Sequence, residues 1–351
     1  MHLKRKKPLC VALLSAALLA IGVCSAQEMK FKENVGSAAK LVRSIDLPGY
    51  TGDFDHFTAD RATNRLFLAA EDHATLEIFD LRDGSHKRTV PGFGIPHSVS
   101  VLPDGKRLLV ADGGAETQSE ILDLATLRKT GSLKLLPGAD SIFRDPDEPT
   151  LYMVTGGKDV HLPYSILYAV DANTLKVKGQ LKIEATHVEA MALEAGTARL
   201  FINLTDKAEV AVIDRRAMKE ITRWKLGSAA ENSPMAFDQD AHRLFVVCRK
   251  PASLLILDSD SGAVLATLPA PGHSDDAAYD QAKHRLYVPG AEGWLGVYQI
   301  KDGNATQIAR IETAAGAKTE FLDSEGHKLF LAVSPGDSKA SAKLLIYDLA
   351  P

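Results

Sequence analysis

The chain has 351 residues, with 41 Lys and Arg against 45 Asp and Glu, a formal net charge of −4, 45% hydrophobic residues and 25% charged residues. This composition excludes an intrinsically disordered chain, a collagen-like chain and a strongly basic nucleic-acid-binding protein. The length is compatible with one large domain or several average ones, so the number of domains has to come from sequence patterns.

The N-terminus has the pattern of a secretory signal peptide. Four basic residues at positions 4–7 precede an apolar run from Leu9 to Val23. This run is short for a membrane span and is followed by small residues. We therefore predict a signal peptide over residues 1–26, cleaved after Ala26, and a periplasmic or secreted protein. A lipoprotein anchor on Cys24 is the alternative, which the bulky Val23 before that cysteine disfavours.

The predicted mature chain is acidic and has one cysteine. Without the four basic leader residues its formal net charge is −8, which gives no bulk attraction to nucleic acid or to an anionic membrane. Cys10 and Cys24 lie in the leader, so Cys248 has no partner for an intramolecular disulfide. Cys248 ends an apolar run that begins at Leu244, which predicts a buried strand thiol rather than a nucleophile. We expect a monomer without a transmembrane segment and without a nucleic-acid partner.

One phrase recurs seven times along the chain. It consists of a basic or polar residue, then Leu, then further strand-forming residues, and its copies begin at Arg65, Arg107, Thr150, Arg199, Arg243, Arg285 and Lys328. Successive copies are 42 to 49 residues apart. Strand-forming repeats with this period are typical of the blades of a β-propeller.

Each copy has further strand patterns on both sides. An alternating apolar stretch follows it and ends on an acidic residue, as in Leu76–Asp80 and Leu254–Asp258, except in the sixth copy, where Leu295–Gln299 ends on Gln. A polar turn and another strand come next. A short strand such as Ser98–Val101 precedes the phrase. Four strands per repeat make one propeller blade.

The two ends of the repeat array predict how the ring closes. The seventh copy stops after its third strand, while Leu41–Ile45 is a spare strand before the first copy. Pairing them leaves no open sheet edge at the seam. We therefore predict an all-β fold, a seven-bladed β-propeller over residues 40–351 that follows a linker at 27–39. In this fold the N-terminal outer strand completes the C-terminal blade.

The segment Pro96–Asp112 resembles the repeat of the YVTN family of exported bacterial β-propellers. By repeat pattern the resemblance covers residues 40–351. The sequence departs from the family signature, because no copy reads Tyr-Val-Thr-Asn and the stretch Asp145–Pro149 in the third repeat is irregular. The resemblance implies a periplasmic or surface propeller, in a family whose members mostly have no assigned reaction.

Polar residues recur at one position of the predicted innermost strands. Ten residues before the repeat anchors stand Asp55, His97, Asp140, Glu189, Ser233, Asp275 and Lys318, with the polar neighbours His56, His187, Asn232, His273, Asp276 and Glu320. Because the innermost strands of a propeller line its central channel, we expect these side chains at the channel mouth.

From this set we predict a ligand-binding site at the channel mouth, formed by Asp55, His56, His97, Asp140, Glu189, Asn232, His273 and Asp275. Its carboxylates are candidate ligands for a divalent cation, Ca²⁺ through oxygen alone or Zn²⁺ with histidines; these are Asp55, Asp140, Glu189 and Asp275. Lys318 at the same level argues against a simple ring of metal ligands. The other interpretation is that these residues are solvated and hydrogen-bond the strand ends of the neighbouring blades.

Two functional hypotheses follow from this site. The first is a non-enzymatic scaffold that binds an unknown protein or a small molecule at the channel mouth. The alternative is a metal-assisted hydrolase of the lactonase type, with His97 or His273 as the general base. Its pool of metal ligands would be Asp55, Asp140, Glu189, Asn232 and Asp275. No nucleophile elbow, phosphate-binding loop or metalloprotease motif is present to name an enzyme class.

The third repeat also contains an insertion, Gly156–Tyr164. Its His161 and Tyr164 are further binding candidates, because insertions between strands often carry binding residues. The insertion is equally compatible with a loop that the fold simply tolerates. Trp294 in the sixth repeat is expected to pack within its blade.

Overall fold

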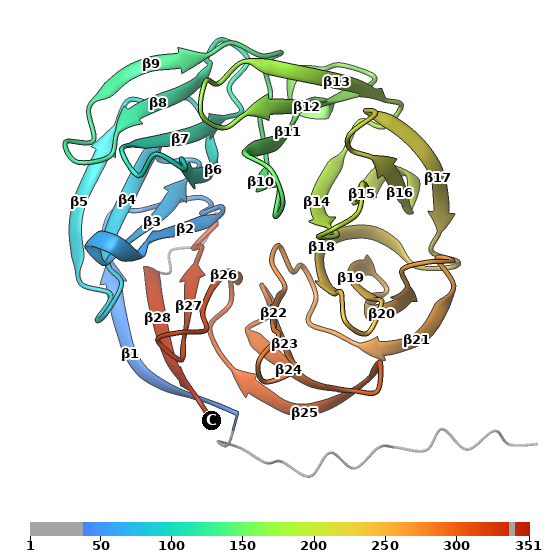
Figure 1. The fold of residues 1–351 in the computed structure, drawn as a ribbon. Coiled ribbons are helices and arrows are strands. Elements are labelled where there is room, and N and C mark those ends of the chain that lie inside the picture. The colour runs from blue at the N-terminus through green and yellow to red at the C-terminus, as the bar shows by residue number, and fades with distance from the viewer. Residues whose placement is uncertain (1–37, 337–340) are drawn as a thin grey trace, which may run out of the picture. The chain divides into compact units, whose positions relative to one another are not determined.

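The computed structural model describes residues 38–336 and 341–351. The predicted signal peptide at 1–26 and all but the last two residues of the predicted linker at 27–39 lie outside the described residues. Within the described residues, seven four-stranded antiparallel sheets form a seven-bladed β-propeller (Figure 1). The predicted fold class and the four strands per repeat are therefore confirmed.

The first six blades each take four strands in chain order, from the innermost to the outermost (Figure 1). Blades 1 to 3 contain β2 (Phe57–Asp60), β3 (Arg65–Ala70), β4 (Thr75–Asp80), β5 (His86–Pro91), β6 (Pro96–Val101), β7 (Arg107–Asp112), β8 (Ser119–Asp123), β9 (Lys129–Leu133), β10 (Ile142–Arg144), β11 (Thr150–Gly156), β12 (Ser165–Asp171) and β13 (Val177–Ile183). Blades 4 to 6 contain β14 (Val188–Leu193), β15 (Arg199–Leu204), β16 (Glu209–Asp214), β17 (Lys219–Lys225), β18 (Ala230–Asp238), β19 (Arg243–Lys250), β20 (Ala252–Asp258), β21 (Val264–Pro269), β22 (Ala278–Asp280), β23 (Arg285–Gly290), β24 (Trp294–Lys301) and β25 (Asn304–Glu312). Short 3₁₀ turns lie between strands at η1 (Arg61–Thr63), η2 (Lys158–Val160) and η3 (Thr205–Lys207).

The seventh blade joins both ends of the described chain. It consists of β26 (Ala317–Asp323), β27 (Lys328–Val333), β28 (Ala342–Leu349) and, outermost, β1 (Ala39–Leu47). β1 pairs antiparallel with β28, from Ala39 opposite Leu349 to Leu47 opposite Ala342. This confirms the prediction that Leu41–Ile45 is the outer strand of the last blade.

Burial follows the position of a strand within its blade. The second strand of blade 1, β3, is buried from Leu66 to Ala70, whereas the outer strand β5 is exposed except at Val90. Blades stack face to face, so their middle strands are covered on both sides and need continuous apolar runs. One such core joins blades 1 and 2 through Phe67, Leu108 and their neighbours. The recurring Leu-containing phrase is this buried second strand.

The acidic residue that ends the third strand in most blades shapes the following turn, whereas the third strand of blade 6 ends at Lys301. Asp123 Oδ1 accepts a hydrogen bond of 2.7 Å from the backbone N–H of Thr126, and Asp258 Oδ1 accepts one of 2.9 Å from Ser261. An Asp side chain that bonds the backbone two or three residues on is a common way to fix a tight turn. The acidic position of the repeat is thus structural.

The arginine that opens the phrase links neighbouring blades. Arg65 of blade 1 donates a 2.7 Å hydrogen bond to the carbonyl of Leu124 in blade 2, and Arg199 of blade 4 donates one of 2.8 Å to Ser259 in blade 5. Each guanidinium therefore satisfies a turn carbonyl of the next blade. This contact gives a physical reason for the basic residue in the repeat.

Blade 3 has Thr150 at this position, and the link between blades 3 and 4 runs in the opposite direction. Arg215, which follows the third strand of blade 4, is fully buried and reaches back into the irregular stretch of blade 3. Its Nε lies 2.7 Å from Asp145 Oδ2, and its Nη2 lies 2.9 Å from Asp147 Oδ2. The irregular stretch Asp145–Pro149 is thus held by one buried arginine.

Candidate functional site

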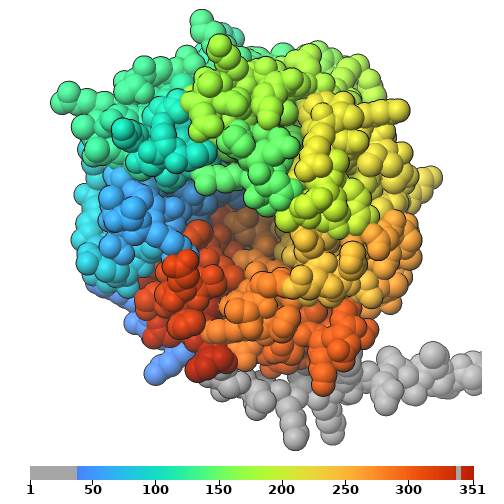
Figure 2. All heavy atoms as spheres, in the orientation of Figure 1, coloured from blue at the N-terminus to red at the C-terminus, as the bar shows by residue number. Residues whose placement is uncertain are grey.

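A cavity of about 390 Å³ lies in the channel where the innermost strands begin. We call it the upper cavity, and Figure 2 shows the hollow at the centre of the ring. All seven blades contribute charged side chains to it. Its lining residues are Phe54, Asp55, His56, Glu71, Ile95, His97, Gly113, Asp140, Lys158, Asp159, His187, Glu189, Arg249, Asp275 and Lys318.

Six of the seven predicted ring positions line this cavity, and the fifth blade is the exception. Ser233 is buried, and its hydroxyl accepts a 3.1 Å hydrogen bond from Nη2 of Arg249. Arg249, near the end of β19, lines the cavity for this blade. The position of these side chains follows the prediction, whereas their role in binding stays a prediction.

Two of the predicted site residues do not line the cavity. Asn232 is fully buried, and its amide donates hydrogen bonds to Oδ1 of Asn203 at 2.8 Å and to the carbonyl of Glu209 at 2.9 Å. It therefore ties blade 5 to blade 4. His273 is exposed and has a left-handed backbone conformation, with φ of 53°.

Residues that the sequence argument missed follow a pattern of their own. Glu71, Gly113 and Arg249 each stand six residues after a repeat anchor, where the second strand ends, and all three line the upper cavity. The sequence argument considered the innermost strands and did not include the ends of the second strands. The matching end of the second strand supplies a further part of the wall.

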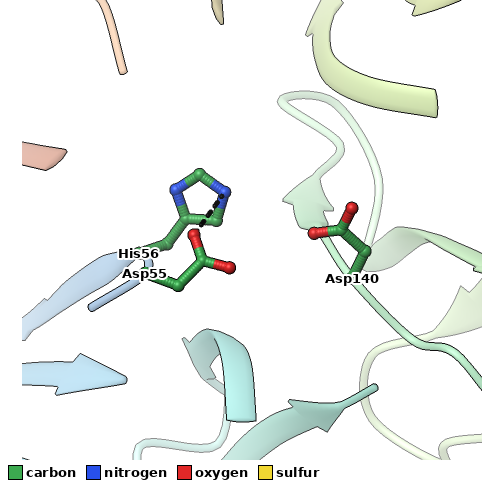
Figure 3. Close-up of side chains that lie close together, drawn as sticks. All are labelled: Asp55, His56 and Asp140. Atoms are coloured by element: carbon green, nitrogen blue, oxygen red, sulfur yellow. Dashed lines mark ion pairs between the residues drawn. The ribbon is translucent and has the colours of Figure 1, made fainter. Parts of the chain in front are cut away.

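Asp55 binds two histidines, one on each of its carboxylate oxygens. Its Oδ2 lies 2.6 Å from Nδ1 of His97, and its Oδ1 lies 3.4 Å from Nε2 of His56 (Figure 3). Burial opposes the ionisation of Asp55, but His56, His97 and Lys318 outweigh burial and lower its pKa to about 2. Burial likewise opposes protonation of His97, yet Asp55 and other nearby carboxylates raise its pKa to about 10.

Asp140 faces Asp55 and His56 from blade 3 (Figure 3). Its carboxylate makes no hydrogen bond or ion pair with another described residue. Burial and the neighbouring charge of Glu189 raise the pKa of Asp140 to about 7. Glu71 is in a similar position, because burial and the charges of Asp55 and Asp72 raise its pKa to about 7. Neither of these two acids forms an ion pair with a cationic side chain in the described part of the chain.

The opposite wall holds the cations. Lys318 Nζ lies 2.7 Å from Asp275 Oδ2 and 3.0 Å from Asp53 Oδ2. Arg249 donates a hydrogen bond to the other oxygen of Asp275. Asp275 was a candidate metal ligand, but two side-chain cations already occupy its oxygens. The expectation that Lys318 neutralises a carboxylate of the ring is thus met at Asp275.

Glu189 is also engaged, by His187 two residues before it. The His187 ring in turn lies 3.0 Å, at Nε2, from Nζ of Lys158, which belongs to the insertion of blade 3. The insertion therefore reaches the cavity through Lys158 and Asp159. His161 is exposed and the Tyr164 ring contacts Lys182, so the two predicted residues of the insertion do not line the cavity.

Two groups of side chains in the described chain could hold a metal ion. They are Asp55, His56 and Asp140, and Asp55, Glu71 and His97, each with one ligand atom per residue within 4.8 Å of the others. Glu189 and Asp275, predicted as ligands, belong to neither group. Carboxylate oxygens mixed with imidazole nitrogens suit Zn²⁺ better than Ca²⁺.

Outside the cavity, two secondary predictions are confirmed. Cys248 is a buried thiol in β19, and burial raises its pKa to about 12. Trp294 is buried at the start of β24, with the Arg310 guanidinium 4.0 Å from its ring centre. Among the described residues, no helix is long and apolar enough to span a bilayer.

Comparison with known proteins gives relatives for part of the chain. It is 26% identical over 196 residues to the uncharacterized protein YncE of Salmonella typhi, and 25% identical over 196 residues to that of Salmonella typhimurium. These matches cover 55% of this chain and 53% of each relative. The chain is homologous to YncE proteins. It spans about half the length of these relatives, and no family model matches it.

A solved structure shows the fold over nearly the whole chain. A chain in the crystal structure of the mitotic checkpoint complex superposes with a TM-score of 0.71 at 16% identity, covering 96% of this chain and 100% of that one. At this identity the likeness concerns the fold alone. The resemblance to the YVTN family stays an expectation beside the YncE homology.

Proposed function

We propose that this protein is an exported seven-bladed propeller that acts as a binding scaffold, with a small polar ligand in the upper cavity. The observation that carries the proposal is that all seven blades place charged side chains around one cavity of about 390 Å³. Pockets of this size with a few oriented polar groups are typical binding sites for small molecules and ions.

The pairing of charges in the cavity supports a positively charged ligand. Asp275 is bound by Lys318 and Arg249, and Glu189 by His187. Asp140 and Glu71 are left without such partners, and each is held at an elevated pKa by burial and by other carboxylates. A cation beside them would relieve this repulsion.

A divalent transition metal such as Zn²⁺ is the ligand that the geometry favours. Asp140, together with Asp55 and His56, offers three ligand atoms from two blades. The protein would have to release protons from its histidines to bind the metal, so affinity rises with pH. These side chains supply a coordination site, and the proposal assigns no reaction to it.

Titration of chelator-treated protein with Zn²⁺, Ca²⁺ and Mn²⁺ by calorimetry tests this proposal. We expect Zn²⁺ to bind, to raise the melting temperature and to release protons. Asp140→Asn should weaken Zn²⁺ binding, whereas Asp159→Asn, an exposed residue of the same cavity wall outside both groups, should not. No binding of any of the three ions, or equal loss in both variants, would overturn the cation assignment.

The hydrolase of the lactonase type is not proposed. Of its five expected ligands only Asp55 and Asp140 share a potential metal group in the described chain. Asn232 is buried between blades, and one of the two candidate bases, His273, does not line the cavity.

The proposed export rests on the signal-peptide pattern of residues 1–26. Fractionation of cells that express the full chain should place the protein outside the cytoplasm, with a mature N-terminus at Gln27. The matching control is a chain without residues 1–26, which should stay in the cytoplasm. A mature protein that begins with lipid-modified Cys24 would support the lipoprotein alternative instead.

A further inference from the structure

A second and larger cavity, of about 840 Å³, continues the channel below the upper cavity. We call it the lower cavity. It shares His56 and Asp275 with the upper cavity and extends to the loops that follow β2 and β6, at Arg61 and Pro103. Its volume is within the range of sites for drug-sized molecules.

The wall of the lower cavity combines apolar side chains with polar ones such as Ser98, Ser100 and Arg144. The innermost strands and the residues beside them supply Phe57, Val99, Phe143, Met235 and Phe321 to its lining. Such side chains favour a ligand with an apolar body, because its apolar surface leaves water on binding. The lower cavity thus differs in character from the charged upper one.

One acid in this lining, Glu320, has no side-chain partner, and only the backbone N–H of Ala278 favours its charged form. Glu320 in β26 is 6% exposed, and neither of its carboxyl oxygens makes a hydrogen bond with a described residue. Burial and the nearby charge of Asp276 raise its pKa well above the usual range. Buried polar atoms in native proteins are nearly always paired, since an unpaired one costs about 1–3 kcal/mol.

The surroundings of Glu320 are acidic. Asp276 Oδ2 accepts a 3.0 Å hydrogen bond from the Glu320 backbone N–H, and its Oδ1 lies 3.1 Å from Nδ1 of His56. His56 is therefore paired with Asp276 and makes no contact with the Glu320 carboxyl group. The arginines that line the cavity are engaged elsewhere: Arg61 binds Asp323, and Arg144 binds the carbonyl of Val101.

We propose that the lower cavity is a second binding site, for an organic amine whose ammonium group donates a hydrogen bond to Glu320 while its apolar body lies against the strand side chains. The bound ammonium favours the ionised form of Glu320, whose carboxylate accepts this charge-assisted bond. The site lies next to the cation site of the upper cavity and shares His56 and Asp275 with that cavity. Its ligand class follows from the buried acid without a side-chain partner and from the apolar side chains in the wall.

Calorimetric titration of the whole protein with phenethylamine, and with 2-phenylethanol as its neutral counterpart, tests the proposal. We expect the amine to bind at least about tenfold more tightly than the alcohol, the factor that one charge-assisted hydrogen bond supplies. Glu320→Gln should weaken amine binding by a similar factor and leave alcohol binding unchanged. Its melting temperature should stay the same or rise, because the variant buries no ionisable group.

The control variant is Asp140→Asn in the upper cavity, which should leave amine binding unchanged. If the amine and the alcohol bind equally, if neither binds, or if Glu320→Gln binds the amine as wild type does, the proposal is wrong. Loss of amine binding in Asp140→Asn alone would move the amine to the upper cavity and also overturn it. Zinc binding by Glu320→Gln reports separately on the upper cavity, so the two proposals can fail independently.

Discussion

His56 Nδ1 in blade 1 lies 3.1 Å from Oδ1 of Asp276 in blade 6, although blade 7 stands between these blades in the ring. The same imidazole lies 3.4 Å from Asp55 on its other nitrogen. His56 lines both cavities and therefore forms part of the partition between them. The partition is a set of charged side chains, which any exchange between the cavities must disturb.

Replacement of His56 should destabilise the propeller. In His56→Asn the carboxylates of Asp55 and Asp276 lose their shared cation, and we expect a loss of about 1–3 kcal/mol in the free energy of unfolding. Urea denaturation measures this value. His161→Asn, at an exposed residue of the blade 3 insertion, is the matched control and should have no effect. Equal stabilities of the two variants would show that the imidazole bridge is energetically neutral.

The histidine beside Asp55 should make stability fall as pH rises. The folded-state pKa of His97 is raised to about 10, against about 6.5 in an unfolded chain. Its protonation therefore stabilises the fold fully below about pH 6.5, and this contribution is lost as pH rises towards 10. Urea midpoints should fall more steeply over this range in wild type than in His97→Gln. If the urea midpoints of wild type and His97→Gln change equally with pH, the raised pKa of His97 does not contribute to stability.

Removal of the buried arginine between blades 3 and 4 should be costly. Arg215→Met leaves Asp145 buried without its cation, and breaking a buried ion pair from one side costs about 3–5 kcal/mol. The neighbouring Arg216 is half-exposed and forms only longer ion pairs with Asp147 and Glu148. Arg216→Met should therefore cost less than about 1 kcal/mol. A similar loss of unfolding free energy in the two variants would mean that the buried ion pair of Arg215 is no more important for stability than the exposed pairs of Arg216.

Deletion of Leu41–Ile45 should open the ring at its seam. These residues hold the central half of the pairing between β1 and β28, so their loss exposes the edge of β28 there. We expect a lower urea midpoint and concentration-dependent association by light scattering. A control chain with the exposed Leu41 and Val42 changed to Thr keeps the strand and should behave as wild type. A deletion variant as stable and monomeric as the control would mean that the seam needs no outer strand.

The sequence was sufficient for the fold because each blade repeats the same local requirements. A buried second strand needs a continuous apolar run, and the turn after the third strand needs an acidic residue, as at Asp123. Both requirements lie within a few neighbouring residues, so they recur visibly at every repeat. The seven copies and the spare strand at Leu41–Ile45 were enough to predict the ring and its closure.

The same reasoning predicted the site only in part, because a residue's position along a strand does not show which groups its side chain contacts. Asp55 and Asp140 converge as expected, but Asn232 turns into the interface between blades 4 and 5. Asp275 lies at the predicted level, yet Arg249 and Lys318 occupy it. These contacts join neighbouring blades through side chains that lie in different repeats, and no local pattern specifies them.

The pairing of β1 with β28 also sets an order of events during synthesis. The ribosome makes Ala39–Leu47 before any complete blade, but its partner strand at Ala342–Leu349 emerges more than 290 residues later. Six blades can fold while the chain is still growing, whereas the seventh cannot. The ring is therefore finished only after translation has passed Leu349, and a ligand of the channel meets a complete wall only from that moment.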